Sequence, residues 1–64
     1  MSTTEQRAFN RLLSALMYAE FAREDPLNGQ DWVLMIRDTL QSTTIQHFPL
    51  LYNAVLAELA DISA

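Results

Sequence analysis

Apolar residues recur at steps of three and four along most of the chain, which is the spacing of one face of an α-helix. The pattern divides the sequence into three predicted helices, over residues 3–23, 29–41 and 49–62. No stretch of useful length alternates between apolar and polar residues, so no strand is predicted. The expected fold is therefore all-α: a single domain over residues 1–64 with a long first helix, a short second helix and a third helix after Pro49.

Capping residues and prolines mark the expected helix boundaries. Two pairs, Ser2 with Glu5 and Thr3 with Gln6, have the spacing of a capping box at the start of the first helix. Pro26 disfavours helix at the residue before it and ends the first element. Leu27 and Trp32 occupy the two positions of a hydrophobic staple across the start of the second helix. The first and third helices are expected to form a hairpin, with the second packed across them.

The predicted third helix has two faces that can pack against other helices. Its core face carries six large apolar residues: Leu51, Tyr52, Val55, Leu56, Leu59 and Ile62. The opposite face carries a seam of mostly small residues: Leu50, Asn53, Ala57, Ala60 and Ala64. Small residues let a second helix approach closely, and a polar residue within such a seam can fix the register of a helix pair. We therefore predict that this seam is a dimer interface.

The length of the chain also favours self-association. A domain of 64 residues buries little surface, and such domains usually need a disulfide, a metal, idealised helix packing or a partner subunit. The sequence has no Cys, and its single histidine, His47, has no second soft ligand to help it hold zinc. No metal or cofactor is therefore predicted. A homodimer is therefore expected to supply the missing buried surface, since symmetric dimers are the commonest oligomers.

A second stripe on the first helix is the candidate surface for another protein. Arginine and tyrosine are enriched at protein interfaces, and they fall on one line of this helix. Two apolar residues of the second helix are also more than a compact three-helix core needs. The predicted partner-binding residues are Arg7, Arg11, Ser14, Tyr18, Phe21, Leu34 and Met35. The structural alternative is a solvated face whose Tyr18 and Phe21 pack on the other helices or on a symmetry mate. Glu20 is expected to pair with Arg23 or Arg37 near the helix end.

The net charge of −4 disfavours functions that require contact with a polyanion such as nucleic acid. Three of the four arginines occur in the first 23 residues, while the rest of the chain is acidic and would repel a phosphate backbone. Neither a membrane span nor a secretory signal is evident, so a soluble cytoplasmic protein without membrane contact is expected. The sequence shows no group of residues that would form a catalytic site, so no enzyme activity is predicted.

The leading hypothesis is a small protein-binding module: an acidic, homodimeric helical bundle that regulates or inhibits another protein. This size and composition are also typical of accessory proteins that phages encode against host machinery. That comparison is an analogy and rests on no shared motif. The alternative is a helix-turn-helix-like transcriptional regulator that contacts DNA through Arg7 and Arg11.

Two further classes are disfavoured by particular residues. Asp38-Thr39-Leu40 is similar to the Asp-Ser-Leu attachment site of acyl carrier proteins, but Thr39 stands where the modified serine belongs. A membrane-active peptide would need a cationic polar face, which the third helix lacks.

Overall fold

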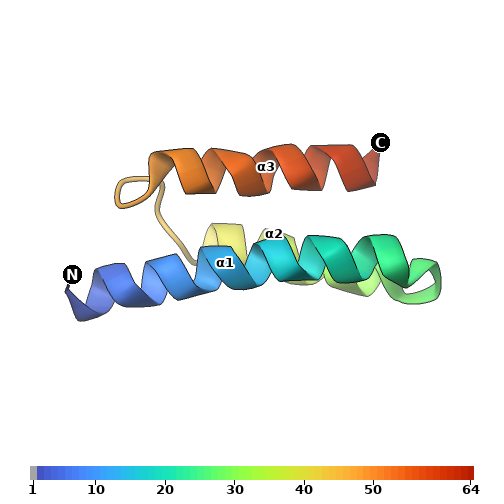
Figure 1. The fold of residues 1–64 in the computed structure, drawn as a ribbon, viewed down its shortest axis with the longest axis horizontal. Coiled ribbons are helices and arrows are strands. Elements are labelled where there is room, and N and C mark those ends of the chain that lie inside the picture. The colour runs from blue at the N-terminus through green and yellow to red at the C-terminus, as the bar shows by residue number, and fades with distance from the viewer. Residues whose placement is uncertain (1) are drawn as a thin grey trace.

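The computed structural model describes residues 2–64, which form three α-helices and one short 3-10 turn (Figure 1). The elements are α1 (Thr3–Glu24), η1 (Pro26–Asn28), α2 (Gly29–Gln41) and α3 (Pro49–Ser63). The predicted all-α class is confirmed, and each predicted helix boundary lies within one residue of the observed one. The described chain is elongated, with extents of 37 × 17 × 16 Å.

Local chemistry explains the two ends of α1. The Ser2 Oγ accepts a hydrogen bond from the backbone N–H of Glu5 at 3.2 Å, and the Ser2 hydroxyl donates to Glu5 Oε1. This is one of the two predicted caps, and it satisfies one of the unpaired N–H groups of the first turn. At the other end the Asp25 N–H still donates to the Phe21 carbonyl at 2.9 Å. Pro26 then ends the helix.

The predicted staple between Leu27 and Trp32 is wrong. Leu27 is 95% exposed, because the 3-10 turn directs it to solvent. Trp32 instead packs its ring against the aromatic residues Tyr18 and Phe21 of α1, which offer it a larger contact area. Asn28 precedes α2, but its side chain donates to Asp25 Oδ2 at 2.9 Å and does not cap the helix.

The order of packing also differs from the expected hairpin of the first and third helices. The connection between α1 and α2 spans only residues 25–28, so these two helices lie side by side and antiparallel (Figure 1). The longer segment of residues 42–48 returns the chain to the other end, and α3 then runs in the same direction as α1 over both helices.

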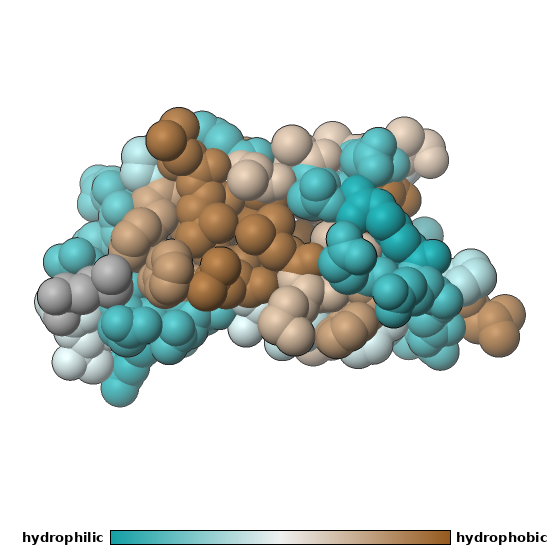
Figure 2. Space-filling view, viewed as in Figure 1, coloured by the Kyte–Doolittle hydropathy of each residue, from teal (hydrophilic) through white to brown (hydrophobic). Residues whose placement is uncertain are grey.

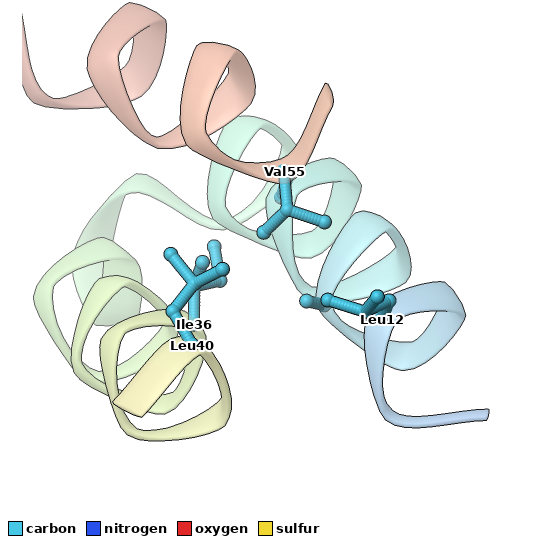
Figure 3. Packing of buried hydrophobic residues seen from close by; sticks show 6 residues of the cluster. Leu12, Ile36, Leu40 and Val55 are labelled. Carbon is cyan, nitrogen blue, oxygen red and sulfur yellow. The ribbon is translucent and has the colours of Figure 1, made fainter. Parts of the chain in front are cut away.

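The core is small and is centred on one large side chain from each helix. Leu12 of α1, Ile36 of α2 and Val55 of α3 are fully buried and point toward one another (Figure 3). The remaining buried apolar residues are Ala8, Ala15, Ala19, Val33 and Leu40. The three alanines all belong to α1, where small side chains allow its neighbours to approach closely. Few large side chains are thus fully removed from water.

Candidate interaction surfaces

The predicted stripe on α1 faces α2, and part of it is used within the chain. The rings of Tyr18 and Trp32 stack with centroids 5.8 Å apart, and the ring of Phe21 lies 5.1 Å from that of Trp32. Arg11 Nη1 donates to the Ser42 carbonyl at 3.1 Å, just past the end of α2. The structural alternative, in which Tyr18 and Phe21 pack on another helix, therefore describes these contacts.

The aromatic cluster still presents apolar surface to solvent. Phe21 is 37% exposed and Met35 is 42% exposed. Met35 follows Trp32 by three residues, so it extends the same row of α2 beside α1. We call Tyr18, Phe21, Trp32 and Met35 the aromatic surface. Leu34 is exposed as well, but it lies on the far side of α2 from Ile36 and does not belong to this group.

The predicted dimer seam lies on the outer face of α3. Every member, Leu50, Asn53, Ala57, Ala60 and Ala64, is exposed. The seam is thus available for contact, and Asn53 faces solvent within the chain described. Leu50 is 85% exposed although it is a large apolar residue.

An apolar face between α1 and α3 was not recognised from the sequence. On α1 the residues Phe9, Leu13, Leu16 and Arg23 share one side, at multiples of three and four. Phe9 at one end lies with its ring 5.4 Å from that of Phe48, and Arg23 at the other end bonds to α3. The leucines between them must therefore face α3 as well.

On α3 the matching residues are Leu50 and Leu51, and we call Leu13, Leu16, Leu50 and Leu51 the α1–α3 apolar face. Leu13 is 40% exposed, and Leu16 and Leu51 are half-buried against the core. Figure 2 shows a continuous apolar area over α1 and α3 in this view. The sequence placed Leu51 on the core face of the third helix and Leu50 in the dimer seam, but it did not indicate that both would lie beside leucines of α1.

An ion-pair cluster closes one end of this face. Arg23 lies between Glu58 and Asp61 of α3, with its Nη2 donating to Asp61 Oδ2 at 2.8 Å. Glu20 is 3.9 Å from the same guanidinium, so one of its two predicted partners is confirmed. The hydrogen bond to Asp61, followed by that to Glu58, raises the pKa of Arg23 above its ordinary value. This cluster joins the C-terminal ends of α1 and α3.

A polar cleft lies at the opposite end of the molecule. It has a volume of about 230 Å³ and is bordered by α1 and by the segment that joins α2 to α3. Its lining residues are Thr4, Arg7, Ala8, Arg11, Ser42, Thr43, Thr44 and His47. Arg7 and Arg11 are thus brought together with His47, for which the sequence predicted no partner.

Other kinds of site and known relatives were also sought. Within residues 2–64, no three His, Cys, Asp or Glu side chains are grouped so that they could hold a metal ion. In the same part of the chain, every helix is too short or too polar to cross a bilayer. Comparison with protein families, with curated proteins and with solved structures finds no match.

Proposed function

We propose that this chain is a small non-enzymatic protein-binding module that pairs with a second copy of itself and regulates or inhibits another protein. The observation that carries this proposal is the imbalance between core and surface. Among residues 2–64, three large side chains are fully buried, whereas nine large apolar side chains are exposed. Single exposed leucines are common, but neighbouring ones on a small domain usually mark an interface.

The available surface is large enough for both contacts. The accessible area of the described chain is 4371 Å². A standard interface buries about 800 Å² on each partner, which is roughly a fifth of this total. A homodimer would therefore leave most of the chain free to bind a second protein.

Two different surfaces suit the two contacts. The α1–α3 apolar face and the neighbouring α3 seam are continuous through Leu50, and both are dominated by aliphatic or small residues. Such a composition suits an interface between identical subunits. The aromatic surface lies on α1 and α2, and aromatic residues such as Tyr18 and Trp32 are enriched at interaction hot spots with other proteins.

The DNA-binding alternative receives less support from the same geometry. In a helix-turn-helix the two helices meet at a steep angle through a turn of three or four residues. Here α2 and α3 are joined by residues 42–48 and lie roughly antiparallel to each other (Figure 1). The third helix also carries Glu58 and Asp61 and no cation. Contact with DNA would rest on Arg7 and Arg11 alone.

Capture from a native lysate tests the module directly. Tagged protein is incubated with nuclease-treated lysate, and bound proteins are identified by mass spectrometry. We expect one stoichiometric protein, whose recovery falls about tenfold or more when Phe21 and Met35 are both replaced by alanine, because hot-spot truncations cost about 2 kcal/mol or more.

The matched control is Leu56→Ala. Leu56 is 41% exposed and belongs to α3, which contributes no residue to the aromatic surface, so recovery should not change. Circular dichroism checks that both variants remain helical. Recovery that is equally weak for the control, or recovery of nucleic acid alone from untreated lysate, would contradict the proposal.

A further inference from the structure

We propose that the polar cleft of Arg7, Arg11, Thr43 and His47 binds a dianionic phosphate group, either inorganic phosphate or the terminal phosphate of a small metabolite. This site is independent of the protein-binding role proposed above. It uses different residues and lies at the opposite end of α1 from the Arg23 ion-pair cluster.

The cleft gathers hydrogen-bond donors from two elements. Arg7 and Arg11 come from neighbouring turns of α1, and Thr43, Thr44 and His47 come from the segment that joins α2 to α3. The bond from Arg11 Nη1 to the Ser42 carbonyl holds that side chain at the cleft wall. A guanidinium has five N–H donors, so most of those on Arg11 stay available for a ligand.

Thr43 supplies a second, independent observation. The residue is only 7% exposed, and its Oγ1 is buried with no hydrogen-bond partner among residues 2–64. A buried hydroxyl without a partner is unfavourable and uncommon in folded proteins. Thr43 forms part of the cleft wall, so rotation of its side chain to another rotamer would turn this hydroxyl toward an oxyanion in the cleft and give it an acceptor.

The charge around the cleft favours an anion. None of the lining residues is acidic. Within residues 2–64 every ion pair involves Arg23, so Arg7 and Arg11 have no carboxylate to neutralise them. Glu5 is the nearest acid in sequence, and its side chain accepts a hydrogen bond from Ser2. Two uncompensated guanidinium groups beside one cleft create a local positive potential in an otherwise acidic protein.

The arrangement of donors favours phosphate over other anions. A carboxylate can be satisfied by the planar fork of one arginine. Two arginines on one wall, with hydroxyl and imidazole groups on the other, surround a ligand and suit the tetrahedral oxygens of phosphate. A nucleic-acid backbone suits the site less well, because the acidic remainder of the chain would repel an extended polyanion.

The test is a titration of full-length ¹⁵N-labelled protein at constant ionic strength, with chloride replaced stepwise by phosphate. We expect saturable shifts of the backbone amides of Thr43 and Thr44, with a dissociation constant of about 1 mM or lower. A parallel titration with adenosine monophosphate distinguishes the two sources: tighter binding than inorganic phosphate indicates a metabolite, and equal or weaker binding indicates the free ion.

Three variants decide whether the cleft is responsible. Arg7→Gln should weaken binding about tenfold or more, since it removes a charged donor. Arg37→Gln removes an exposed arginine of α2 outside the cleft and should leave binding unchanged. Thr43→Val should weaken binding without lowering the thermal midpoint, because the hydroxyl it removes has no partner in the chain. The last variant separates a ligand-binding role from a structural one.

Several results would overturn the proposal. They are the absence of saturation, an equal loss of binding in the Arg7 and Arg37 variants, and a lower thermal midpoint for Thr43→Val with unchanged binding. Tighter binding of a short DNA duplex than of either phosphate compound, with a steep dependence on salt, would assign the two arginines to nucleic-acid contact instead.

Discussion

Trp32 was correctly predicted to pack against another apolar side chain, but the predicted partner was wrong. The spacing of Leu27 and Trp32 indicated a local staple, but Trp32 packs on Tyr18 and Phe21 from a different helix. Local spacing cannot compare a contact within one turn with a larger contact across two helices. The same limit applies to Tyr18 and Phe21: the sequence left open whether they bind another protein or pack on the other helices, and it did not indicate that Trp32 of α2 would be their partner.

This environment leads to a stability prediction. The indole Nε1 of Trp32 is buried and has no hydrogen-bond partner within residues 2–64. Trp32→Phe should therefore change the free energy of unfolding by less than about 1 kcal/mol, since the ring contacts are largely kept and an unpaired N–H is removed. Trp32→Ala should cost about 2 to 4 kcal/mol, because it removes the ring against which two α1 aromatics pack.

Urea denaturation followed by circular dichroism measures both values. The comparison between the two variants isolates the N–H from the ring. Equal losses for the two variants would mean that the N–H has a partner in solution, in contradiction to the packing described here.

At the level of elements, helix ends were predictable and helix packing was not. Ser2, Pro26 and Pro49 carry chemistry that acts within one turn, and the observed boundaries follow it closely. The pairing of α1 with α2 depends on the length of a loop and on the areas of competing faces. Seven residues separate α2 from α3, and no local signal indicates where that segment leads. The cleft arises only when residues 42–48 are placed beside α1.

The Arg23 cluster gives a prediction at this scale. Arg23→Gln removes the cation that joins α1 to both Glu58 and Asp61. Because the pKa of Arg23 is raised, loss of its positive charge reduces stability only as the pH rises through that raised pKa. Ionisation of Arg23 therefore causes no pH dependence near neutrality.

Salt is the informative variable for this cluster. The groups are exposed enough to be screened, so the thermal midpoint of Arg23→Gln should lie slightly below that of the parent at low salt, with the difference shrinking at high salt. Arg37→Gln is the control, because Arg37 makes no ion pair within residues 2–64. A difference that persists at high salt would indicate that the aliphatic part of Arg23, and not its charge, joins the helices.

At the scale of the whole molecule, the main question is what covers the α1–α3 apolar face. Dimerisation was predicted from the length of the chain and from the α3 seam, and the structure adds Leu13, which is exposed, and Leu16 and Leu51, which are half-buried. If two copies associate through this surface, folding and association are linked. The thermal midpoint should then rise by a few degrees for each tenfold increase in protein concentration.

Leu50→Glu tests this linkage. Leu50 lies where the α1–α3 apolar face meets the α3 seam, and it is 85% exposed. A charge there would be buried on association, so we expect a monomer by light scattering and a thermal midpoint that no longer depends on concentration. Leu27→Glu is the matched control: Leu27 is 95% exposed, in the turn between α1 and α2, and its replacement should leave the dimer intact. The two substitutions change the same residue type at similar exposure, so equal effects of both variants would exclude this surface as the site of self-association. A parent chain that is monomeric at all concentrations would exclude it as well.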